Sequence, residues 1–298
     1  KEHIINGVHV LPGTALIEIA HFAVADYLGN NDFSLENLVY MVPLSCEENQ
    51  QVTLHTVVSE EGANLYVRAN SRNSEGKWTP HIELEVTPEK ASFTDELESV
   101  ETIQKRCKPV DITRSEENNN SIVQIESTRW NNINCAFANE NELLLEFKMK
   151  QELESDSALY YLYPSLLDPA INSGNYILKE TYLPFSCKWM NFMTDLPSHF
   201  YSHIVRKPTL DESNELAFFD IALFTEDGNI CGKLKDYCIK KVHEEKSLAF
   251  IKQEKENLYH KREWILCNET LTEEKLKMDE QVMWIEFCDI NQKSREIQ

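Results

Sequence analysis

Hydrophobic and polar positions alternate in two different ways along this chain, and the changes between them mark its elements. After Pro12, apolar residues recur every three or four positions as far as Tyr27 and stop before Gly29, which predicts a helix over residues 12–28. Short runs with a period of two follow, separated by turn residues, and they predict antiparallel strands. These runs cover residues 38–44, 51–58, 64–70 and 81–86.

The same order of elements returns in the second half of the chain. Residues 142–149 predict a strand, and residues 164–180 predict a helix that begins with Pro164. Further strands are predicted over residues 183–190, 200–206, 216–224 and 231–242. A helix wrapped by an antiparallel meander, present twice at a separation of about 150 residues, predicts an α+β fold. We expect a duplicated unit whose two sheets pair side by side.

The expected domain boundaries follow the changes in pattern. The first unit is predicted over residues 1–95 and the second over residues 122–243, with a connector of little periodicity at residues 96–121. From Glu244 onward the composition becomes rich in Glu and Lys, and two strand-like runs flank a short helical run. Residues 244–298 are therefore expected to be a linker and the edge of a following domain.

The composition is that of a globular protein with a strongly acidic surface. Of the 298 residues, 42% are hydrophobic and 27% are charged, and 29 Lys and Arg against 50 Asp and Glu give a net charge of −21. Such a surface repels phosphate, so neither nucleic acid nor an anionic membrane is expected as a partner. No run resembles a membrane span or a secretory signal, which favours a cytoplasmic location.

Metal and nucleotide cofactors are not expected. The eight cysteines are scattered without a C-x-x-C pair, and zinc ribbons need closely spaced cysteine pairs. No glycine-rich phosphate loop or dinucleotide motif is present in the sequence. Neither a nucleotide-dependent reaction nor a metal site is therefore expected.

A titratable residue is present near the N-terminal end of each predicted helix. The first segment reads H-x-x-x-G-x-x-x-x-P, with His3, Gly7 and Pro12 at its fixed positions, and leads directly into the first helix. The second contains Pro-Ser-Leu-Leu-Asp, which ends at Asp168, and Asn172 follows four residues later. If the two units pack as a pseudo-dimer, these helix ends converge on one cleft that contains an imidazole and a carboxyl.

With these two motifs at this distance, residues 1 to about 243 resemble the dehydratase domains of modular polyketide synthases. The resemblance implies a double hotdog fold and a lyase that removes water, by syn elimination, from a β-hydroxyacyl thioester. It implies that the substrate is carried on the phosphopantetheine of an acyl carrier protein and that the domain has no cofactor of its own. Neighbouring domains of the same synthase and a second copy of the chain are the other expected partners.

The family's catalytic residues correspond to His3 as the base and Asp168 as the acid, with Asn172 orienting the acid. Imidazole has a pKa close to working pH, which suits removal of an α-proton, and a carboxyl shielded from water can protonate the leaving hydroxyl. Backbone amides at the start of the first helix can stabilise charge on the thioester oxygen. The residues expected to contact the substrate are Gly7, Pro12, Gly13 and Tyr163.

The sequence departs from the family pattern at three places. Asn172 stands where the family has Gln or His, and Tyr163 stands where the family has the His that opens the second motif. The tyrosine of the family's Tyr-Gly-Pro-x-Phe segment has no counterpart before Ile122. Related domains shift a double bond from α,β to β,γ, or close a pyran ring, with the same histidine. These activities, and an inactive scaffold that docks the carrier, are therefore the alternatives to dehydration.

Overall fold

The computed structural model describes residues 3–5, 8–45, 52–62, 64–73, 76–89, 98–112, 123–125, 128–178, 180–209 and 214–242. Gly7 and the predicted linker and domain edge at residues 244–298 lie outside the described residues. Within the described ranges, no helix is both long and apolar enough to cross a membrane.

The first half of the chain forms one long helix and a set of antiparallel strands. Helix α1 (Gly13–Leu28) confirms the prediction for residues 12–28, and it ends at Gly29, whose φ of 70° is favourable for glycine. The strands of this half are β1 (His3–Ile5), β2 (Val8–His9), β3 (Ser34–Tyr40), β4 (Thr53–Glu61), β5 (Asn64–Arg72) and β6 (Trp78–Thr87).

The second half repeats this order with more irregular pieces. Its helical segments are η1 (Thr128–Trp130), η2 (Gln151–Leu153), α3 (Glu154–Ser157), α4 (Pro164–Asn172) and α5 (Asn175–Leu178). Its strands are β8 (Val123–Ile125), β9 (Ile133–Ala138), β10 (Glu142–Lys148), β11 (Tyr182–Phe192), β12 (His199–Arg206), β13 (Leu216–Phe224) and β14 (Ile230–Lys241).

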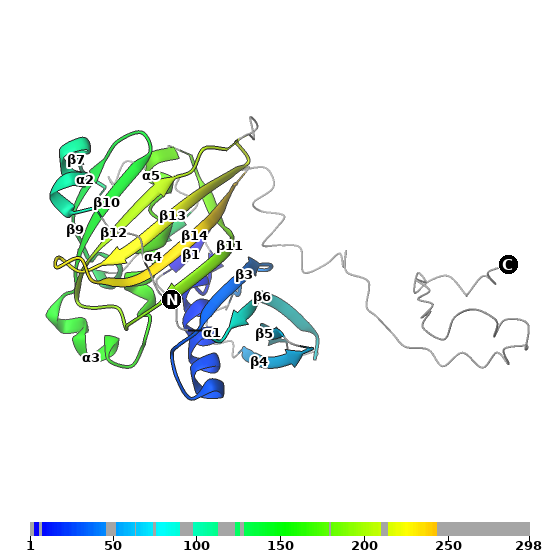
Figure 1. Cartoon of the computed structure of the whole chain (residues 1–298). Helices are drawn as coiled ribbons and strands as arrows, with labels where there is room; N and C mark the ends of the chain where they lie inside the picture. The colour runs from blue at the N-terminus through cyan, green and yellow to red at the C-terminus, as the bar shows by residue number, and fades with distance from the viewer. Residues whose placement is uncertain are drawn as a thin grey trace, which may run out of the picture. The chain divides into compact units, whose positions relative to one another are not determined.

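The strands of the two halves merge into one large sheet. Its order is β4-β5-β6-β3-β11-β14-β13-β12-β10-β9-β7, where β7 is Lys108–Val110, and every neighbouring pair is antiparallel. The two halves join where β3 pairs with β11, with Leu38 opposite Cys187 and Leu35 opposite Met190 (Figure 1). The predicted side-by-side pairing of the two sheets is therefore confirmed. A separate three-stranded sheet has the order β2-β1-β8.

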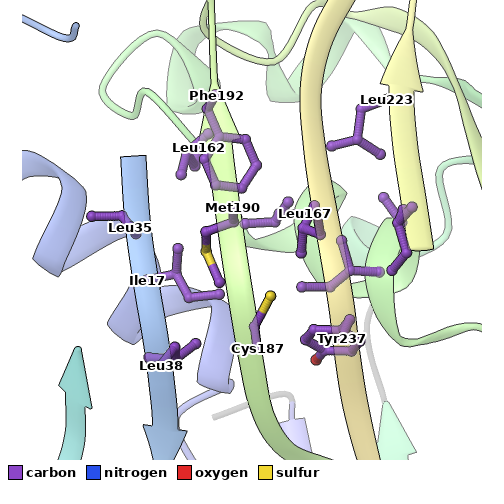
Figure 2. Close-up of a cluster of buried hydrophobic side chains, with 14 of the residues drawn as sticks. Ile17, Leu35, Leu38, Leu162, Leu167, Cys187, Met190, Phe192, Leu223 and Tyr237 are labelled. Carbon is purple, nitrogen blue, oxygen red and sulfur yellow. The ribbon is translucent and has the colours of Figure 1, made fainter. Parts of the chain in front are cut away.

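The main hydrophobic core lies between this sheet and the helices α1 and α4. Ile17 of α1, Leu167 of α4 and Met190 of β11 are fully buried and belong to one cluster. Figure 2 shows these side chains together with those of the central strands β3, β11 and β14. Burial of an aliphatic side chain of this size contributes about 1.5–3 kcal/mol, so the junction between the halves is also the centre of the core.

Polar contacts also tie the two halves together. The Glu18 carboxylate of α1 is buried and accepts hydrogen bonds from the backbone amides of Tyr161, at 3.0 Å, and Leu162, at 2.8 Å. Burial raises the pKa of Glu18, and the two amide bonds act in the opposite direction. Glu18 therefore fixes the segment that leads into α4 against the first helix. A second polar contact lies on the sheet, where the Asn191 side-chain amide donates to the Phe33 carbonyl at 2.6 Å.

Three predictions of secondary structure need correction. The predicted helix 164–180 is divided after Asn172, where Ser173 Oγ donates to the Pro169 carbonyl at 2.6 Å and Gly174 abuts Phe219. The strand predicted at residues 38–44 corresponds to β3, which begins and ends earlier in the chain. After β3, the Leu44 carbonyl accepts a hydrogen bond from the Leu11 amide at 2.8 Å rather than from a strand of the large sheet.

The third correction concerns the predicted connector. Residues 96–121 include a short helix, α2 (Val100–Arg106), and a strand, β7 (Lys108–Val110), that pairs with β9. Helix α2 buries only Ile103 fully, so its sequence has no periodic apolar stripe. It begins where Ser99 Oγ accepts a hydrogen bond from the Thr102 amide at 3.3 Å. Such short elements depend on tertiary contacts, which the sequence pattern does not display.

Stability is expected to fall in mild acid because of His21 on α1. This imidazole is 2% exposed, is stacked on Tyr161 at 4.4 Å between ring centroids, and burial lowers its pKa to about 4. Between pH 6.5 and 4 the unfolded chain therefore binds a proton that the folded chain does not bind. Going from pH 7 to 5 is expected to cost about 2 kcal/mol through this group. Urea unfolding of wild type and His21→Phe at both pH values measures it; an equal acid-induced loss in the two proteins would contradict the assignment.

Candidate active site

His3 is held in a defined orientation on β1. Its Nδ1 lies 3.1 Å from the carbonyl oxygen of Val10, and the Val10 amide donates to the His3 carbonyl at 3.0 Å. Because a carbonyl oxygen only accepts hydrogen bonds, Nδ1 carries the proton in the neutral ring. The lone pair is then on Nε2. The half-buried imidazole is thus prepared to accept a proton at Nε2.

Trp130, which the sequence did not single out, is the aromatic neighbour of His3. The two ring centroids are 5.8 Å apart, with an angle of 44° between the planes. Trp130 is the last residue of η1, and η1 packs against α4. The contact therefore connects the histidine of the first half to the helix that carries Asp168.

Asp168 lies buried on α4, where groups from both halves reach its carboxyl. Thr14 Oγ1, from the first turn of α1, donates to Asp168 Oδ1 at 3.3 Å. Asn172 Nδ2, one helical turn further along α4, donates to the same oxygen at 2.9 Å. Oδ1 thus accepts one hydrogen bond from each half of the chain. The predicted partnership of Asp168 and Asn172 is present in the geometry.

Two buried tyrosines, which the sequence pattern did not indicate, complete this network. The Tyr237 hydroxyl of β14 donates to Asn172 Oδ1 at 2.6 Å, so the Asn172 amide is engaged at both its oxygen and its nitrogen. Tyr40 lies at the end of β3, and its hydroxyl is buried next to Tyr237. Burial, and then nearby charge that includes Asp168, raises the pKa of both phenols well above the usual value. Both hydroxyls therefore stay protonated.

Gly13 and Pro12 form the start of α1 beside this network. A Cβ added to Gly13 would lie 2.7 Å from Tyr40 Cε1, so glycine is required for the Tyr40 ring to pack there. Pro12 is the N-cap residue rather than part of the first turn, and no side chain caps the helix. Because Thr14 reaches Asp168, this helix end lies next to the carboxyl. Substrate contact by Pro12 and Gly13 remains a prediction, and Gly7 lies outside the described residues.

Tyr163 occupies the N-cap of α4. Its ring is buried, with its centroid 5.3 Å from that of Tyr160, and its carbonyl accepts the amides of Leu166 and Leu167 at 3.0 Å. Among the described residues its hydroxyl has no hydrogen-bond partner. The structure therefore places Tyr163 at the start of the helix that carries Asp168, and its predicted contact with substrate remains a prediction.

Models of one protein family match both halves of the chain. The family model described as "Polyketide synthase dehydratase domain" matches residues 1–72, and the one described as "Polyketide synthase dehydratase N-terminal domain" matches residues 124–249. The chain belongs to the polyketide synthase dehydratase family. The family that the two motifs resemble is therefore confirmed.

Relatives of this dehydratase domain include very long synthases of Bacillus subtilis (strain 168). Polyketide synthase PksM is 23% identical over 259 residues and polyketide synthase PksL 24% identical over 267 residues. These matches cover 79% and 80% of this chain but only 6% of each synthase. The chain thus spans a small part of the length of these relatives.

Solved structures similar to this dehydratase domain show the fold. An N-terminal dehydratase from the difficidin assembly line has a TM-score of 0.76 at 17% identity, covering 84% of this chain and 91% of that chain. A dehydratase domain of a trans-AT synthase from Brevibacillus brevis has a TM-score of 0.73 at 20% identity, covering 81% and 89%. A trans-acyltransferase synthase enoyl-isomerase has a TM-score of 0.65 at 14% identity, covering 80% and 93%. The chain has the double hotdog fold that the resemblance implied.

The hydrogen bond from Tyr237 to Asn172 is expected to stabilise this site. Tyr237→Phe leaves the Asn172 carbonyl without its donor in a buried setting, which costs about 1–3 kcal/mol. Urea unfolding at pH 7 measures this loss. The matched control is Tyr27→Phe, which removes a hydroxyl bonded to Glu60 at 2.8 Å on the exposed face of α1 and is expected to cost under about 1 kcal/mol. Equal losses of unfolding free energy in the two variants would show that the buried hydrogen bond contributes no more to stability than the exposed one.

Proposed function

We propose that this domain removes water from a β-hydroxyacyl thioester, with His3 as the base and Asp168 as the acid. The observation that supports it most directly is that hydrogen bonds hold both groups in defined orientations. The Val10 carbonyl keeps the proton of the neutral imidazole on Nδ1, and the donors Thr14 and Asn172 occupy Oδ1 of the carboxyl. A base and an acid are the two groups that such an elimination needs.

In the proposed reaction, His3 Nε2 takes a proton from the carbon next to the thioester carbonyl. The electrons of that C–H bond form the new double bond, and the bond from the β-carbon to the hydroxyl oxygen breaks. Protonated Asp168 gives its proton to that oxygen, which leaves as water. Histidine has then gained one proton and aspartate has lost one, so proton transfer back to Asp168 restores the site.

The start of α1 is suited to stabilise charge that develops on the thioester oxygen. No side chain caps this helix end, and its first turn reaches the acid through Thr14. Amide groups and the helix dipole at an N-terminus stabilise negative charge, most effectively where water is excluded. We assign this role to the amides near Gly13.

The substrate is proposed to arrive on the phosphopantetheine arm of an acyl carrier protein. The support is family membership, together with relatives that are synthases of which this chain covers 6%. Neighbouring domains of one synthase are accordingly the proposed partners. Neither His3 nor Asp168 needs a further cofactor for the elimination described above.

Mass spectrometry with a β-hydroxyacyl pantetheine thioester tests the proposed reaction. Wild type is expected to remove one water from the substrate, whereas His3→Ala and Asp168→Asn each lose at least about 100-fold in rate, because each lacks one proton-transfer group. The matched controls are His55→Ala on β4 and Asp26→Asn on α1, both exposed side chains. They are expected to keep the wild-type rate.

A second assay, with the α,β-enoyl thioester in heavy water, separates the alternatives. Deuterium uptake that needs His3 but tolerates Asp168→Asn, without any loss of water in the first assay, would replace dehydration by a double-bond shift. An enoyl-isomerase is among the solved structures with this fold. No reaction in either assay would favour a scaffold that only docks the carrier.

Asn172 is proposed to act on the reaction through Asp168. Asn172→Ala removes the 2.9 Å hydrogen bond to Oδ1, and a bond of this kind to a charged group contributes about 1.5–3 kcal/mol. Steady-state kinetics are expected to show a fall of about 10- to 100-fold in kcat with little change in KM. A rise in KM at unchanged kcat would indicate substrate binding instead.

A further inference from the structure

The indole nitrogen of Trp130 is a buried donor without an acceptor. Its Nε1 has essentially no exposed surface and forms no hydrogen bond within the part of the chain that the structure describes. An indole N–H can only donate. Leaving such a group unpaired costs about 1–3 kcal/mol, whereas an apolar ring of similar size would avoid that cost. A phenylalanine would fill much of the same space without a polar group.

The position of this N–H restricts what can pair with it. The Trp130 ring is in contact with the His3 ring, at 5.8 Å between centroids, and η1 packs on the helix that carries Asp168. A group that accepts a hydrogen bond from Trp130 therefore lies close to the proposed base. A β-hydroxyacyl thioester carries two oxygens in its reacting part, the thioester carbonyl and the β-hydroxyl, and both accept hydrogen bonds.

Other buried hydroxyls near the site give a less specific indication of a bound ligand. Tyr163 and Ser165 also carry a buried hydroxyl without a partner among the described residues. A hydroxyl can rotate and can donate or accept, whereas the indole N–H has one fixed direction. Trp130 is also in ring contact with His3. It is therefore the residue whose unpaired donor is tied most closely to the proposed chemistry.

We infer that Trp130 is a substrate-binding residue that donates its indole N–H to an oxygen of the acyl thioester, next to His3. The inference rests on the proposed function, because that function defines the ligand. An oxygen that gains charge as the α-proton leaves, or as the C–O bond breaks, is held more tightly by this donor in the transition state than in the ground state. Loss of the N–H therefore lowers the rate of the reaction as well as binding.

The direct test is the indole N–H resonance of Trp130 in 15N-labelled protein, assigned by its absence in Trp130→Phe. The Asp168→Asn variant is titrated with two probes, 3-hydroxybutanoyl-pantetheine and butanoyl-pantetheine thioesters. We expect a downfield shift of the Trp130 indole proton when the 3-hydroxybutanoyl probe binds. The same shift with both probes identifies the carbonyl as the acceptor, and a shift with the hydroxylated probe alone identifies the β-oxygen.

The outcomes separate this inference from the proposed function. Movement of other resonances while the Trp130 N–H stays in place would overturn the inference and leave the proposed function intact. No movement of any resonance at millimolar probe would contradict the proposed function itself, and the inference with it. This readout does not depend on turnover.

Kinetics give an independent test on the wild-type background. Trp130→Phe keeps an aromatic ring, smaller than indole, against His3 and removes the N–H, and we expect kcat/KM for dehydration to fall by about 10- to 100-fold. The matched control is Trp189→Phe on β11, whose ring lies under the Lys235 ammonium at 5.5 Å, and it is expected to keep the wild-type value. Wild-type kcat/KM in Trp130→Phe, at an unchanged urea midpoint, would overturn the inference.

Discussion

The antiparallel pairing of β3 with β11 is the interaction on which the rest of this structure depends. Each half supplies strands with one apolar face, and neither half alone covers the edge at which it stops. The pairing joins the two edges into a continuous sheet, and Leu35, Leu38, Cys187 and Met190 then share one buried face. An unpaired central edge would expose both backbone groups and apolar side chains to water. The same contact brings α1 and α4 together over the middle of the sheet.

The proposed base and acid are a consequence of that junction, because each half contributes one of them. His3 precedes α1 and is oriented by the Val10 carbonyl of its own half. Asp168 belongs to α4, yet one of its hydrogen-bond donors, Thr14, comes from α1. Glu18 also joins the two halves, because it accepts hydrogen bonds from the backbone amides of Tyr161 and Leu162 just before α4. The proposed catalytic pair, divided between two repeats, is thereby held by packing between the repeats.

Asp168 packs against a network of buried polar side chains rather than against apolar ones. Tyr237 donates to Asn172, and Asn172 donates to Asp168. Asn172 is shorter than the Gln or His of the family pattern, and the tyrosine fixes its amide from the side of the sheet. Such a network is stable when its members are paired, since an unpaired group in a low dielectric is costly. It also gives the amide of Asn172 a single orientation, with its nitrogen toward the acid.

The amino-acid sequence was enough to identify the family and the repeated order of helix and meander, and it singled out His3, Asp168 and Asn172 as the proposed site. Periodicity reveals an element when one face is apolar over several turns, as in α1, and a motif reveals residues at fixed spacing. Periodicity did not reveal helix α2, which buries only one side chain fully. It also did not reveal that the predicted second helix is divided after Asn172. Only the tertiary structure brought Trp130, Tyr40 and Tyr237 to the site, from η1 and from two strands far apart in the chain. Their roles depend on contacts between elements, and no local pattern of hydrophobic and polar residues encodes such contacts.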